Sequence, residues 1–204
     1  MPELEFFFDC SSPWTYLAFD GILKLADEVD ADAILCAGDL YEQERFTPDT
    51  REFIRGVFCR TDRMIVIAPG NHDWLGPNSL YTQAAWSSNV HIFDHDSLTP
   101  LELDDGLTLW GAAFTRPTRT TGFLQDGFAV DRGGVHLALF HGSERRGLPF
   151  EIEGKAAYAP FAAEDIERAG LCHAFVGHHH TPRGDALGSR SRGTMRDEHH
   201  RDRR

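Results

Sequence analysis

The feature that most constrains the fold is an alternation of short apolar runs with longer segments of helical periodicity. The runs are rich in β-branched and aromatic residues and end at Gly, Asp or Pro, which is typical of β-strands. Strands that alternate with helices favour βαβ units and a largely parallel sheet, so the sequence predicts an α/β fold. We expect strands at residues 4–8, 33–37, 64–68, 90–93, 107–114, 135–140 and 174–176. We expect helices at residues 13–29, 50–59, 79–86 and 163–169.

Composition indicates a globular protein without disulfides. The chain has 204 residues, of which 41% are hydrophobic and 25% charged, enough to bury a core in one domain. It contains no apolar run of about 18 residues, and its start has acids where a signal peptide needs bases, so we expect a cytoplasmic protein with no membrane partner. None of its four cysteines forms a Cys-x-x-Cys pair.

The charge of the chain is unevenly distributed. The net charge is −12, which opposes general binding to nucleic acid unless metal ions supply local positive charge. Residues 183–204 hold seven arginines against four acids, so they form a basic tail behind a strongly acidic domain at residues 1–182. With few apolar side chains, the tail is expected to be disordered, and the alternative is a basic arm that contacts a polyanion.

Polar clusters follow four of the expected strands where those strands end. They are Gly38-Asp39, Gly70-Asn71-His72-Asp73, His141-Gly142 and Gly177-His178-His179-His180. In parallel sheets the carboxyl ends of the strands meet at one edge, where ligands bind. Carboxylate, amide and imidazole groups suit borderline divalent ions, namely Mn²⁺, Fe²⁺ and Zn²⁺.

Each cluster alone also has a simpler explanation. Gly38-Asp39 could be an ordinary turn, and His141 a hydrogen-bonded histidine at a strand end. His178 and His180 are two residues apart, so an extended backbone points both the same way, while His179 points away. The four clusters in this order, each behind an apolar run, nevertheless predict a metal site.

The four clusters resemble the signature of the calcineurin-like metallophosphoesterases. That signature consists of Asp-x-His, Gly-Asp, Gly-Asn-His-Asp or Gly-Asn-His-Glu, a single His, and Gly-His-x-His, and four of its five parts stand between about residues 20 and 183. The segments GDLYEQERFTPDT, APGNHDW and APFAAEDIERAG are most similar to the bacterial SbcD-like DNA-repair exonuclease branch. The resemblance implies two packed mixed β-sheets flanked by helices, here without the last strands of the family fold.

The resemblance also implies roles for individual residues. Two divalent ions, most consistent with Mn²⁺ and with Fe or Zn as alternatives, would be bridged by one carboxylate and would hold the phosphoryl group for in-line attack by water. The implied metal ligands are Asp39 as the bridge, Asn71, His141 and His178 for one ion, and Asp9 and His180 for the other. His72 would protonate the leaving oxygen, and Asp73 would orient His72.

The first part of the signature is where the sequence departs from the family. After the strand expected at 4–8 the chain reads Asp9-Cys10-Ser11, so a hydroxyl replaces the family's histidine and would leave the second ion weakly bound. Residues 3–19, which include EFFFDCSSPWTYLAF, resemble instead the start of thioredoxin-like DsbA-family proteins, especially 2-hydroxychromene-2-carboxylate isomerases.

The sequence is therefore compatible with three functions. The first is hydrolysis of phosphodiester bonds at a dinuclear metal centre, with DNA as a candidate substrate of an exonuclease. The second is a single-metal relative that binds metal and phosphate with little turnover. The third is a thioredoxin-fold isomerase or oxidoreductase. By family resemblance, a homodimer or an ATPase would be the protein partner.

Overall fold

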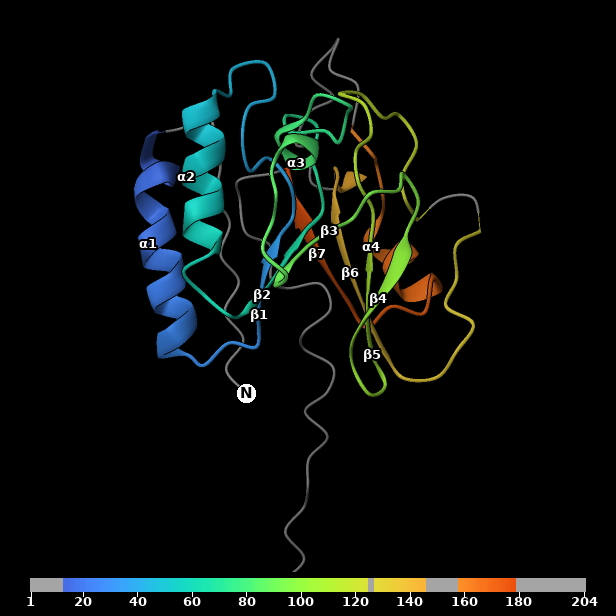
Figure 1. The fold of residues 1–204 in the computed structure, drawn as a ribbon. Helices are drawn as coiled ribbons and strands as arrows, with labels where there is room; N and C mark the ends of the chain where they lie inside the picture. Colours follow the sequence, from blue (N-terminus) through green and yellow to red (C-terminus); the bar gives the residue numbers. More distant parts are fainter. Residues whose placement is uncertain (1–12, 125–126, 146–157, 179–204) are drawn as a thin grey trace, which may run out of the picture.

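Two β-sheets lie face to face at the centre of the molecule, and helices cover their outer faces (Figure 1). This computed structural model describes residues 13–124, 127–145 and 158–178. The described elements are α1 (Pro13–Glu28), β1 (Ala33–Cys36), α2 (Pro48–Phe58), β2 (Met64–Ile67), α3 (Leu80–Gln83), β3 (Val90–Ile92), β4 (Thr99–Asp104), β5 (Leu107–Gly111), β6 (Val135–His141), α4 (Ala163–Arg168) and β7 (His173–Gly177). The expected architecture of two packed sheets flanked by helices is confirmed.

The two sheets differ in their strand directions. The first sheet has the order β1-β2-β3 and is parallel throughout, with Cys36 opposite Ile67. The second has the order β4-β5-β6-β7, and only its β4–β5 pair is antiparallel. In β6 and β7, His141 lies opposite Gly177. The register therefore brings the last residues of neighbouring strands level with one another.

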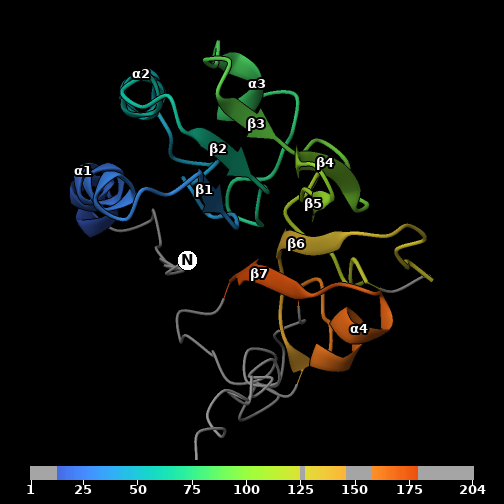
Figure 2. The same ribbon diagram turned by 90° about the horizontal axis from the view of Figure 1, so that it is seen from below.

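Three apolar clusters hold the layers together. One lies between α1, α2 and the first sheet, and another between the second sheet and α4, so the helices lie on opposite outer faces (Figure 2). The third lies between the sheets and includes Val66 and Phe93 from one sheet and Leu109 and Leu139 from the other, all at most 2% exposed. Burial of these side chains fixes the distance between the two sheets.

The principal element that the sequence did not predict is β4. It forms a hairpin with β5 across Asp105-Gly106, and Gly106 adopts a φ of +74°. Exposure alternates along Thr99–Asp104, which is typical of a strand with one face in the core. The Asp-Gly dipeptide between alternating residues was the signal that could have revealed this hairpin.

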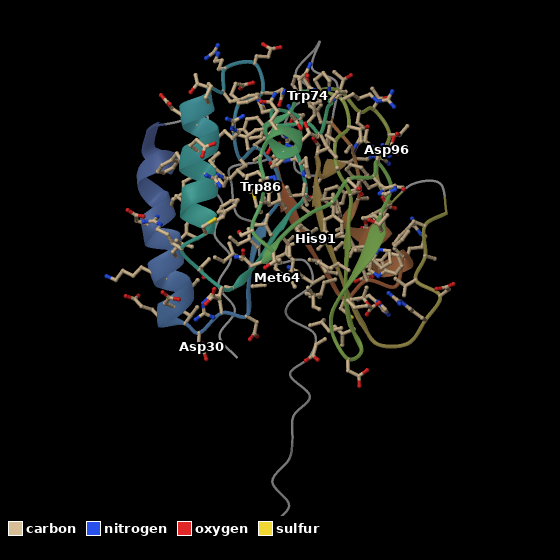
Figure 3. All side chains as sticks on the ribbon, in the orientation of Figure 1. Asp30, Met64, Trp74, Trp86, His91 and Asp96 are labelled. Atoms are coloured by element: carbon tan, nitrogen blue, oxygen red, sulfur yellow. The ribbon has the colours of Figure 1, made fainter. Side chains whose placement is uncertain are left out.

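Two expected elements, the helix at 79–86 and the strand at 107–114, end three residues earlier than predicted. Helix α3 stops at Gln83 because Trp86, labelled in Figure 3, folds back and donates its indole N–H to Tyr81 O at 2.9 Å. Strand β5 ends at Gly111, after which Ala112 N–H donates to Leu139 O in β6 and Phe114 N–H donates to Pro69 O, just beyond β2. The strand expected at 4–8 and the tail expected at 183–204 lie outside the described residues. Within the described part, no helix combines the length and hydropathy needed to cross a membrane.

Gly111 provides a test of the packing between the sheets. A Cβ atom at this position would overlap the ring of Phe93, which is 2% exposed. We therefore expect Gly111→Ala to lower the free energy of unfolding by about 1–3 kcal/mol, measured by urea denaturation.

The matched control is Gly56→Ala in α2, where a Cβ atom would meet nothing within 4 Å. Alanine should raise the free energy of unfolding there by about 0.5–1 kcal/mol, because it favours a helix more than glycine does. Equal effects of the two substitutions would contradict this account of the contact between the sheets.

Candidate metal centre

The carboxyl ends of β1, β2, β6 and β7 meet at one edge of the molecule (Figure 1). Trp74 lies at this edge, and Met64, the first residue of β2, lies toward the opposite one (Figure 3). The four polar clusters of the sequence begin where these strands end, as parallel strand order predicts.

Glycines allow the strand ends to approach closely. A Cβ atom on Gly38 would lie 2.7 Å from both Gly70 N and His141 Nδ1, and one on Gly177 would collide with the carbonyl oxygen of Ala37. Gly38 also adopts a φ of +87°, a region that residues with side chains rarely occupy. Glycine is therefore required at these positions by the packing of the two sheets against each other.

His141, the last residue of β6, lies fully buried between the two sheets. Its Nδ1 lies 2.8 Å from Ala37 O, and since a carbonyl only accepts, we assign the ring proton to Nδ1. Its Nε2 then holds a lone pair. The ring of Phe114 packs edge-on against the imidazole at 5.7 Å. One hydrogen bond and one ring contact thus set both the tautomer and the orientation of His141.

Three further ligand atoms converge on this lone pair. His141 Nε2 lies 2.9 Å from Asn71 Oδ1, 3.1 Å from His178 Nδ1 and 3.3 Å from Asp39 Oδ2. The ligand atoms of Asp39, His141 and His178 all lie within 4.8 Å of one another. Lone pairs that face each other this closely repel unless a cation or protons lie between them. Two imidazoles with a carboxylate and an amide oxygen fit a borderline divalent metal ion.

The structure therefore brings together the four expected ligands that it describes, Asp39, Asn71, His141 and His178. Asp9 and His180 lie outside the described residues, and their roles stay predictions. Asp39 and His178 both have positive φ angles, 57° and 105°. Residues other than glycine hold such angles only where their surroundings determine them, which is common at functional sites.

Asp73 anchors the backbone beneath this centre. Its side chain is fully buried and accepts hydrogen bonds from Asp39 N at 3.0 Å, Leu40 N at 2.8 Å, Gly70 N at 2.6 Å and the hydroxyl of Tyr81. Burial, followed by the charge of Asp39, raises the pKa of Asp73. The three N–H groups nevertheless require an acceptor, which the ionised carboxylate supplies at both oxygens. Asp73 thus fixes the segments that carry Asp39 and Asn71.

This geometry corrects the expected pairing of Asp73 with His72. Asp73 accepts from the four groups above, and His72 Nδ1 lies 2.9 Å from Glu42 Oε2 instead. The reason is depth, since Asp73 is fully buried whereas the side chain of His72 is 50% exposed. Glu42 was not among the residues predicted from the sequence; its position three residues after Asp39, in the same segment behind β1, was the available signal.

Asp73→Asn tests the anchoring of the strand ends. An asparagine offers one carbonyl oxygen and turns its N–H₂ group toward backbone donors, so at least one N–H loses its partner. We expect the metal-free protein to lose about 1–3 kcal/mol of unfolding free energy, measured by denaturation in EDTA. Tyr81→Phe removes one donor and leaves the carboxylate, so it should cost less. A larger loss from Tyr81→Phe would contradict this ranking.

The geometry agrees with comparisons to known proteins. The sequence profile of the calcineurin-like phosphoesterases matches residues 15–182, which include the four described ligands. Over 175 residues the chain is 26% identical to the "Uncharacterized metallophosphoesterase YhaO" of Bacillus subtilis (strain 168). The match covers 81% of this chain and 41% of that protein, so the chain spans about two fifths of the curated relative's length. The narrower resemblances, to SbcD-like exonucleases and to thioredoxin-like proteins, stay predictions. The chain belongs to the calcineurin-like phosphoesterase family.

Proposed function

We propose that the chain hydrolyses phosphodiester bonds with divalent metal ions, Mn²⁺ by preference, and that DNA is a candidate substrate. The observation that carries this proposal is the convergence of Asn71 Oδ1, His178 Nδ1 and Asp39 Oδ2 on the bare nitrogen of His141. Metal ions held by these residues would supply the Lewis acidity that polarises a phosphoryl oxygen and activates water. Asp9 and His180 complete a second, weaker site in this proposal, because Ser11 replaces an imidazole ligand.

His72 is the proposed proton donor to the leaving oxygen. It follows the ligand Asn71, and its backbone N–H donates to Asp39 Oδ1 at 3.1 Å, so its backbone is tied to a metal ligand. Glu42 accepts from its Nδ1, which leaves Nε2 to carry the transferable proton. The carboxylate of Glu42 also stabilises the cationic, doubly protonated ring that a proton donor needs.

The choice of DNA rests on the segments similar to SbcD-like exonucleases. The net charge of −12 works against it, because an acidic surface repels the phosphate backbone. A comparison of bis(p-nitrophenyl) phosphate, single-stranded DNA and cyclic nucleotides as substrates tests this choice directly. Hydrolysis of cyclic nucleotides with no action on DNA would contradict it.

Metal removal tests the proposed chemistry. Exhaustive EDTA treatment should abolish hydrolysis of bis(p-nitrophenyl) phosphate, and added Mn²⁺ should restore it. Ca²⁺ serves as the control ion, since it prefers oxygen ligands and fits a site with two imidazoles poorly. Full activity after EDTA treatment would exclude a metal-dependent reaction.

Three substitutions separate metal binding from proton transfer. His178→Ala removes a ligand and should lose Mn²⁺ in calorimetric titration. His72→Ala should keep Mn²⁺ and lose about 10²–10⁴-fold in kcat, with a smaller loss on esters that have good leaving groups. Glu42→Gln should keep Mn²⁺ and lose part of that rate.

The control for Glu42→Gln is Glu102→Gln. Glu102 lies on β4 and pairs with Arg132, so its substitution should leave kcat unchanged. If His72→Ala emptied the metal site while His178→Ala kept it filled, the two roles would be reversed.

A further inference from the structure

Tyr158 lies directly against the metal ligand His178. The two ring centroids are 5.4 Å apart with an angle of 61° between the planes, and the tyrosine is half-buried. His178 in turn contacts His141 with its ring, at 5.0 Å. Tyr158 therefore contacts the converging ligand atoms through the ring of His178. It belongs to none of the four polar clusters of the sequence.

The backbone around Tyr158 is fixed on both sides. Ser143 N–H donates to Tyr158 O at 2.9 Å, and the next residue, Ala159, donates its N–H to Arg119 O at 2.9 Å. Ala159 is fully buried and adopts a φ of +41°, an uncommon conformation for a residue with a side chain. Strain of this kind persists where the surroundings hold it, and it is frequent at ligand sites. The position of the Tyr158 ring is thus set by the fold.

The hydroxyl of Tyr158 is the part of this side chain that packing does not explain. It makes no hydrogen bond to any described residue. The hydroxyls of the other two tyrosines with described side chains both donate hydrogen bonds: Tyr41 donates to Gln43 Oε1 at 2.6 Å, and Tyr81 donates to Asp73. A phenylalanine at position 158 would pack against His178 equally well. A tyrosine hydroxyl usually finds a polar partner when it is buried, and an oxygen of a ligand bound beside His178 can be that partner.

We propose that Tyr158 binds the substrate by donating its hydroxyl to a non-bridging oxygen of the phosphoester next to His178. This inference rests on the proposed function, because it takes a phosphoester as the ligand. A phenol is a neutral donor near pH 7, so it binds an anionic oxygen without adding a cation that would compete with the metal ions. It also adds a directional contact to a site whose described ligand atoms, Asp39 Oδ2, Asn71 Oδ1 and the two imidazole nitrogens, are all acceptors.

Tyr158→Phe tests this proposal because it removes the hydroxyl and keeps the ring on His178. With the full chain loaded with Mn²⁺, kcat/KM for bis(p-nitrophenyl) phosphate should fall about 10- to 100-fold, as expected for loss of a hydrogen bond to a charged group. Inorganic phosphate should bind about tenfold more weakly in calorimetry, while the Mn²⁺ titration and the thermal midpoint stay as in the wild type. A purely structural role would change the last two measurements and leave phosphate binding intact.

Ser87→Ala is the matched control, because it deletes another hydroxyl without a hydrogen-bond partner among the described residues, in the segment between α3 and β3. It should leave phosphate affinity and kcat/KM unchanged. Phosphate binding by Tyr158→Phe as tight as that of the wild type would overturn the inference, whatever the activity. If the wild type hydrolyses no phosphodiester but Tyr158→Phe still weakens phosphate binding, the proposed function fails and the role of Tyr158 stands.

Discussion

The hydrogen bond between His141 Nδ1 and the carbonyl of Ala37 is the contact on which the site depends. It joins residues 104 positions apart in the chain and links the end of one sheet to the end of the other. Because this bond takes the proton of Nδ1, it leaves the lone pair of Nε2 facing Asn71 Oδ1, His178 Nδ1 and Asp39 Oδ2. A change in the distance between the sheets would therefore alter the tautomer of His141 as well as the shape of the site.

Apolar packing between the sheets holds them at the distance that this hydrogen bond requires. Phe93, Leu109 and Leu139 pack between the sheets and set their separation, and Gly38 and Gly177 allow the strand ends to close on His141. Asp73 then fixes the two segments that follow β1 and β2. The metal centre is thus a result of burial in the core below it and of backbone hydrogen bonds around it.

Much of this arrangement could be predicted from the sequence. Apolar runs that end in glycine revealed β1, β2, β6 and β7, and the edge shared by parallel strands placed Asp39, Asn71, His141 and His178 together. These predictions succeeded because each depends on local pattern and strand order. Hairpin β4–β5 was missed because half of β4 is exposed, which weakens its apolar signal.

Partners that come from distant segments could not be predicted. The pairing of His72 with Glu42, and the burial of Asp73 beneath the backbone, depend on how two loops pack, which the position of Glu42 close behind Asp39 in the sequence does not determine. Tyr158 contacts His178 from the connection before α4, where Ser143 N–H donates to Tyr158 O and Ala159 N–H donates to Arg119 O. Residues of this kind become visible only when side chains are placed in three dimensions.

The proposed ligand atoms come from residues 39, 71, 141 and 178, and this spread along the chain would couple metal binding to the stability of the fold. An unfolded chain cannot hold these four atoms together, so an ion would bind almost exclusively to the native state. Mass action then favours the folded chain by about 2.7 kcal/mol when the free ion is at 100 times its dissociation constant. Metal bound at the proposed site would thus raise the abundance of the protein in a cell, since chains without it would unfold more often and be degraded sooner.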